Sequence, residues 1–174
     1  MKTRTPKLTT TDQGHLKCAE GWLELGDHVS AFDELEKIEP LCRAYPDVLK
    51  VRWRIYNKAG KHGNAFTIAE GLTRLLPGDP EMFIWRSHSV RRMQGGGVEQ
   101  ALQLLLDVAH DFPDETAVPF DLARYNCALG KLAEAKNWLH IAFAVAERNG
   151  TAKEWKTRTL DEPDLAPLRK EFSL

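Results

Sequence analysis

The residue types that carry catalytic or metal chemistry are scattered through this sequence. The six histidines form no HExxH pair, and none lies at zinc-ligand spacing from Cys18, Cys42 or Cys127. No CxxC pair and no GxSxG sequence is present. We therefore expect no metal, no cofactor and no enzymatic activity.

Two local clusters have a chemical and a structural interpretation. Gly95-Gly96-Gly97 precedes a predicted helix whose first amides could bind a phosphate, but no GK[ST] follows, which favours a loose turn. Asp161, Glu162 and Asp164 could act as paired acid and base. A helix start also favours acids through its dipole, and we prefer that interpretation.

A repeat of about 34 residues organises the elements that would position any site. Four glycines follow apolar helical stretches at spacings of 34, 36 and 34 residues: Gly26, Gly60, Gly96 and Gly130. Five residues after each glycine lies an alanine: Ala31, Ala65, Ala101 and Ala135. Four residues further on lie Leu35, Ala69, Leu105 and Leu139. Glycine at positive φ suits a tight turn between antiparallel helices, and the later columns share one face of the second helix.

This pattern predicts paired helices along the chain. The expected ranges are 13–25 and 28–44, 47–59 and 62–76, 80–94 and 97–111, and 116–129 and 132–148. Pro40 is expected to kink the second of these helices. Two shorter stretches follow at 151–159 and 163–171. We expect them to cover the last apolar face with Trp155, Leu160, Leu165, Leu168 and Phe172.

The pattern resembles the tetratricopeptide repeat. Seven residues of the third repeat match its consensus: Trp85, Ser89, Gly96, Ala101, Leu105, Val108 and Pro113. The resemblance implies an all-α fold, a right-handed α-solenoid of four helix–turn–helix repeats over residues 13–148. Its repeats are expected at about 13–45, 46–79, 80–113 and 114–148. A flexible tail is expected at 1–12, and a C-terminal capping helical segment at 149–174.

The resemblance also implies that the first helix of each repeat lines a concave groove that holds a partner protein. In the second to fourth repeats the predicted groove residues are Lys50, Arg54, Asn57, Lys58, Arg86, Val90, Met93, Phe120 and Arg124. This set contains five cations and no acid, in a chain whose net charge is −1. Arginine binds a carboxylate through two parallel hydrogen bonds. The set therefore predicts an acidic peptide or a free C-terminal carboxylate as the ligand.

Three other interpretations remain open for these residues. The cations could only solvate the surface or pair with acids on neighbouring helices. The chain could be a small chaperone or adaptor of the secretion-chaperone kind, or a helical repeat that binds RNA. The near-neutral charge argues against nucleic acid and membrane partners. Without a secretory signal or an even cysteine set, we expect a cytoplasmic monomer that acts as a protein-interaction scaffold.

Overall fold

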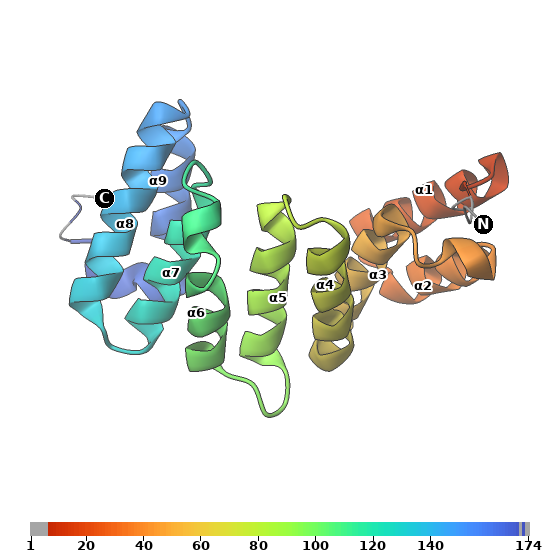
Figure 1. Ribbon diagram of the computed structural model, residues 1–174, viewed down its shortest axis with the longest axis horizontal. Helices are drawn as coiled ribbons and strands as arrows, with labels where there is room; N and C mark the ends of the chain where they lie inside the picture. Colours follow the sequence, from red (N-terminus) through yellow and green to blue (C-terminus); the bar gives the residue numbers. More distant parts are fainter. Residues whose placement is uncertain (1–6, 171, 173–174) are drawn as a thin grey trace. The chain divides into compact units, whose positions relative to one another are not determined.

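The computed structural model describes residues 7–170 and 172, and these residues form helices joined by turns, without a strand (Figure 1). The chain divides into two compact units, unit 1 (Met1–Gly78) and unit 2 (Asp79–Leu174). Unit 1 contains α1 (Thr10–Glu24), α2 (His28–Glu36), the 3-10 helix η1 (Pro40–Cys42), α3 (Pro46–Lys58) and α4 (His62–Leu75). Unit 2 contains α5 (Pro80–Arg92), α6 (Val98–Leu106), η2 (Ala109–Asp111), α7 (Ala117–Ala128), α8 (Leu132–Arg148), α9 (Ala152–Asp161) and η3 (Pro163–Leu168). Within the described residues, no helix combines the length and apolar character that a membrane span requires.

Antiparallel helix pairs build both units, as the repeat predicts. In unit 1, α1 packs on α2 and α3 packs on α4, while α5–α6 and α7–α8 are the pairs of unit 2. The small and apolar columns of each second helix face the interior: Ala31 and Leu35 are fully buried in α2, and Ala135 and Leu139 are fully buried in α8. The all-helical prediction and the buried columns of the second helices are confirmed.

Glycine closes the turns within the helix pairs, with one change of register. Gly26, Gly60 and Gly130 have φ of 86°, 70° and 73°, in the left-handed region that side chains avoid. In the third turn the residue with positive φ is Gly95, at 77°, and the prediction of Gly96 for this role is wrong. Gly96 is constrained differently, because an added Cβ would lie 1.9 Å from the carbonyl oxygen of Val90.

Replacing Gly96 with alanine should destabilise unit 2. The new methyl group meets backbone rather than a flexible side chain, so the turn must shift, and we expect a loss of about 3 kcal/mol in the free energy of unfolding. Urea denaturation measures this loss. As a control, Gly71→Ala in α4 meets nothing within 4 Å and removes a helical glycine, so it should raise stability by roughly 0.5–1 kcal/mol. A neutral Gly96→Ala variant would show that the close approach to Val90 is absent.

Two helix boundaries near the N-terminus differ from the sequence prediction. Thr9 and Asp12 form a capping box, so α1 begins at Thr10 and residues 10–12 are helical instead of part of a flexible tail. The rest of that predicted tail includes residues 1–6, which lie outside the described residues. The second predicted helix, 28–44, is too long: α2 ends at Glu36, and Pro40, which has no N–H to donate, begins η1 instead of kinking a longer helix.

The segment after α8 covers α7 and α8. Trp155 of α9 and Leu165 and Leu168 of η3 are buried in one cluster with Phe120 and Leu139. Phe172 packs against this cluster, whereas Leu160 is 42% exposed and was wrongly predicted to take part. Within the stretch predicted as a helix at 163–171, residues Pro163–Leu168 form the 3-10 helix η3.

Candidate functional site

In unit 1, the predicted groove residues lie on α3. Arg54 and Lys58 are exposed, and Lys50 and Asn57 are half-buried. Their spacing of three and four residues places them on one face of the helix. The side-chain oxygen Oδ1 of Asn57 is buried without a hydrogen-bond partner among the described residues.

Other cations of unit 1 are neutralised within the fold. Glu36 forms two ion pairs. One carboxylate oxygen lies 2.6 Å from Arg43 Nη1, and the other lies 2.8 Å from Arg52 Nη1. Neither Arg54 nor Lys58 forms an ion pair with a residue that the structure describes. The α3 face therefore presents two uncompensated cations one helical turn apart.

In unit 2, two of the predicted contact residues belong to the core. Val90 is 3% exposed and Phe120 is fully buried, with the Phe120 ring centroid 4.9 Å from that of Trp155. Their predicted exposure is wrong, and for Phe120 the reason is visible: α9 and η3 fold back so that this face of α7 is internal. Met93 is half-buried at the end of α5.

Arg86 packs against an aromatic ring. Its guanidinium carbon lies 5.7 Å from the centroid of the Phe83 ring, a cation–π distance. The side chain is half-buried, and its Nε has no hydrogen-bond partner in the part of the chain that the structure describes. Arg86 is therefore less available than Arg54 to an external carboxylate.

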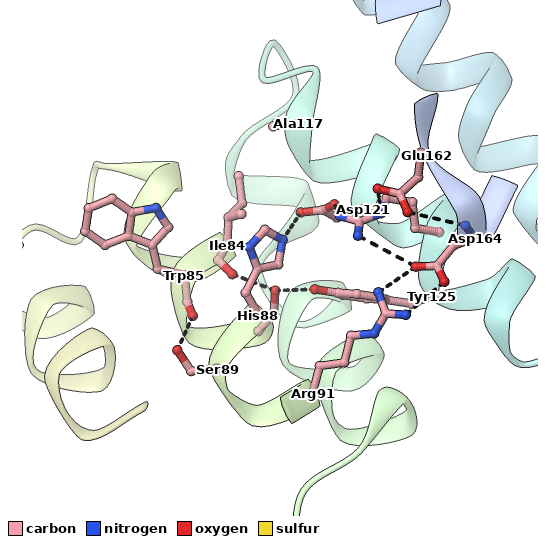
Figure 2. Close-up of polar contacts among 12 residues, drawn as sticks. Ile84, Trp85, His88, Ser89, Arg91, Ala117, Asp121, Tyr125, Glu162 and Asp164 are labelled. Carbon is pink, nitrogen blue, oxygen red and sulfur yellow. Dashed lines mark hydrogen bonds and ion pairs between the residues drawn. The ribbon is translucent and has the colours of Figure 1, made fainter. Parts of the chain in front are cut away.

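Arg124 binds the acids of a charged cluster that we call the Arg124 network, and Figure 2 labels its members Asp121, Glu162, Asp164 and Arg91. Its Nη1 lies 2.5 Å from Asp121 Oδ1, its Nε 2.9 Å from Glu162 Oε2, and its Nη2 3.6 Å from Asp164 Oδ2. Arg91 binds Asp164 through two nitrogen atoms, at 2.6 and 3.0 Å. Arg124 is only 9% exposed, so the prediction that it is a free groove cation is wrong. It pairs with acids on neighbouring elements, as the alternative interpretation expected.

The network continues to the buried carboxylate of Asp121. His88 Nε2 lies 2.7 Å from Asp121 Oδ2 on the side opposite Arg124. Burial alone would raise the pKa of Asp121, but the nearby His88 and Arg124 outweigh that effect and lower this pKa below its usual value. Asp121 is therefore held as an anion inside unit 2.

The same region contains a hydroxyl pair that argues against nucleophilic catalysis. A His–Asp pair such as His88–Asp121 could activate a serine. However, the Ser87 hydroxyl donates to the carbonyl of Ile84 and lies 2.9 Å from the Tyr125 hydroxyl, which can donate to it. Burial, the largest cause, raises the pKa of Tyr125 far above its usual value. These contacts stabilise the packing of α5 on α7.

Metal binding has no support in the geometry. In residues 7–170 and 172, no three His, Cys, Asp or Glu side chains are grouped so that they could hold a metal ion. The acids Glu162 and Asp164, considered above as a catalytic pair, are half-buried and engaged by Arg124 and Arg91. Glu162 also accepts the backbone N–H of Asp164, as expected for an acid at a helix start.

The sequence contains only part of the signal for the Arg124 network. Asp121 and Arg124 are three residues apart on one helix, a spacing at which opposite charges pair. Arg91 and Asp164 are separated by 73 residues, and no local pattern connects them. The fold of the segment after α9 brings them together.

Comparison with known proteins identifies the fold. No protein-family model matches the chain, and no curated protein matches its sequence. A solved structure titled "MamA RS-1 ArsTM double mutant" superimposes with a TM-score of 0.67 at 12% identity, covering 79% of this chain and 76% of that one. TTC0263, described as a thermophilic TPR protein of Thermus thermophilus, gives a TM-score of 0.62 at 18% identity, covering 93% of this chain and 97% of that one. The chain has the tetratricopeptide-repeat fold, which confirms the resemblance noted in the sequence.

Proposed function

We propose that this tetratricopeptide fold is a non-catalytic scaffold that holds a carboxylate-bearing segment of a partner protein on the face of α3. Helical-repeat proteins of this fold generally use their extended surfaces to bind other proteins, which supports the general assignment. Arg54, Asn57 and Lys58 would make the principal contacts. We extend the proposal to a monomer in the cytoplasm, as the sequence analysis expects.

The uncompensated charge on α3 is the observation that carries this proposal. Arg54 and Lys58 are exposed, and neither pairs with an acid among the described residues. An arginine fork binds a carboxylate in two places, while lysine adds a mobile point charge. An extended peptide with alternating acids would meet both cations on one helix face.

Asn57 adds a polar group to the same face. Its Oδ1 is buried and has no hydrogen-bond partner within the described residues. Since Oδ1 is enclosed by the chain itself, only the exposed part of the half-buried Asn57 side chain can meet a partner. We therefore propose that this part of Asn57 contacts the partner beside the two cations, which contact its carboxylates.

The alternative functions have less support. An adaptor of the secretion-chaperone kind would also use a peptide groove, and only the identity of its partner would distinguish it from a general scaffold. An RNA-binding repeat needs polar reader residues that recur at fixed positions in each repeat. The first helices share no such pair, because Arg54 of α3 corresponds to Val90 of α5 and to Arg124 of α7.

Reversing the two α3 charges should abolish partner binding. Each charge-assisted contact contributes about 1.5–3 kcal/mol, so Arg54→Glu/Lys58→Glu should weaken binding by about 100-fold or more. Affinity purification from the source cell at low and moderate salt, with the wild-type chain and this variant as baits, measures the effect. Binding should also weaken as salt rises, because exposed charges are screened.

A matched control separates a local effect from a change in net charge. Lys17→Glu/Arg74→Glu reverses two exposed cations of α1 and α4, and should retain the partner. If the α3 variant retains the same partners as the wild type, the α3 face is not the binding surface. If both double variants lose them equally, binding depends on net charge alone, and the proposal also fails.

A further inference from the structure

Residues 162–168 lie on α7 in the position that a peptide ligand was predicted to take. Phe120, Arg124 and Cys127 form one stripe of α7, at spacings of four and three residues. That stripe is covered from within the chain: Leu165 and Leu168 of η3 are buried in one cluster with Phe120 and Cys127. The stripe is therefore not a bare surface but an occupied one.

The segment contacts unit 2 as a bound acidic peptide would, with its carboxylates held by arginine side chains. Asp164 binds Arg91 through both carboxylate oxygens (Figure 2). Glu162 binds Arg124. An open pocket of about 570 Å³ remains beside these contacts, lined by Arg91, Arg124 and the exposed Arg92. Arg92 has no ion-pair partner among the described residues. Asp121, Glu162 and Asp164 pair with Arg91 and Arg124, so Arg92 is the cation of this site that an incoming carboxylate can still reach.

Side chains, more than backbone hydrogen bonds, hold the segment in place. The six residues of η3 form a 3-10 helix, whose hydrogen-bond geometry is poorer than that of an α-helix. Two of them, Pro163 and Pro167, have no N–H to donate. The attachment depends on two carboxylates and two leucines, which a segment from another protein can supply equally well.

We propose that the α7 face, with Arg91, Arg92 and Arg124, is a second binding site, and that residues 162–168 are its resident ligand. The site accepts a segment that has two carboxylates separated by one intervening residue and followed by leucine. A tethered ligand has an effective concentration of about millimolar, so a free segment of the same chemistry binds weakly until the resident segment is displaced. This site belongs to unit 2 and does not depend on the proposed function of the α3 face in unit 1.

The test is binding of a labelled peptide, residues 159–170, to the full chain by fluorescence anisotropy. A release variant, Asp164→Lys/Leu165→Ser, places a cation against Arg91 and removes one buried leucine. We expect it to bind the peptide at least 10-fold more tightly than the wild-type chain. A peptide carrying Glu162→Gln and Asp164→Asn should bind the release variant at least 10-fold more weakly than the native peptide. The Arg54→Glu/Lys58→Glu variant should bind the peptide as the wild type does.

Hydrogen exchange distinguishes a displaceable ligand from a permanent part of the core. In the release variant and in the milder Asp164→Asn variant, α7 and α8 should keep most of their amide protection, and the added peptide should restore the remainder. Equal peptide affinity in the wild type and the release variant would overturn the proposal. So would a loss of protection throughout α7 and α8 in both variants that the peptide does not reverse.

Discussion

Replacing Arg124 with alanine is expected to lower the free energy of unfolding of unit 2 by about 3–5 kcal/mol. Arg124 touches three carboxylates, and one of them, Asp121, is only 2% exposed. Without the guanidinium, His88 is the one side chain among the described residues that still binds the Asp121 carboxylate, and Glu162 loses its arginine partner. An unpaired buried charge is far more costly than the loss of an exposed ion pair. Urea denaturation, read through the amide exchange of α7 and α8, measures this loss.

Arg74 provides the matched control for this substitution. It pairs with Glu70 one turn away on α4, and its side chain is 73% exposed. Exposed pairs of this kind contribute little, so Arg74→Ala should change stability by at most about 0.5 kcal/mol. A loss below about 1 kcal/mol for Arg124→Ala would contradict the structural role assigned to Arg124.

Phe120→Ala is expected to lower the free energy of unfolding of unit 2 by about 3–5 kcal/mol. The ring is fully buried and packs against Trp155, so its removal leaves a cavity between α7 and α9. A surface contact residue would behave in the opposite way, weakening partner binding with little change in stability. Denaturant unfolding and partner capture on the same variant separate the two outcomes.

Ile141 of α8 is the control for Phe120. It is 46% exposed in the same unit, so Ile141→Ala should change stability by at most about 0.5 kcal/mol. A folded Phe120→Ala variant with wild-type stability and impaired partner binding would restore the original interpretation of this residue as a groove contact.

The sequence was sufficient to predict the helix pairs, because their determinants are local. A glycine turn followed by alanine and leucine at fixed offsets specifies two antiparallel helices and the face on which they meet. Where several neighbouring residues could fill the same role, the sequence did not predict which of them would do so. Three consecutive glycines in the third turn all tolerate positive φ. In the structure Gly95 adopts it, while Gly96 lies against the carbonyl of Val90.

The candidate site was harder to predict, because helical periodicity identifies a face but not what covers it. Phe120 and Arg124 lie on the stripe expected for the first helix of a repeat, yet η3 covers that stripe. The covering segment is adjacent to α7 only in space, and the Arg91–Asp164 pair joins positions 73 residues apart. By contrast, no described segment neutralises Arg54 or Lys58 of α3, so the prediction of exposed cations holds there.

Lysine labelling of a captured complex tests the proposed function most directly. The chain, alone and with its bound partner, is treated with an amine-acetylating reagent, and the modification of Lys58 is compared with that of Lys17, an exposed lysine of α1. If a carboxylate segment lies on α3, the partner should protect Lys58 several-fold and leave Lys17 unchanged. Equal labelling of Lys58 in the free and bound chain would place the interface elsewhere and contradict the proposed function.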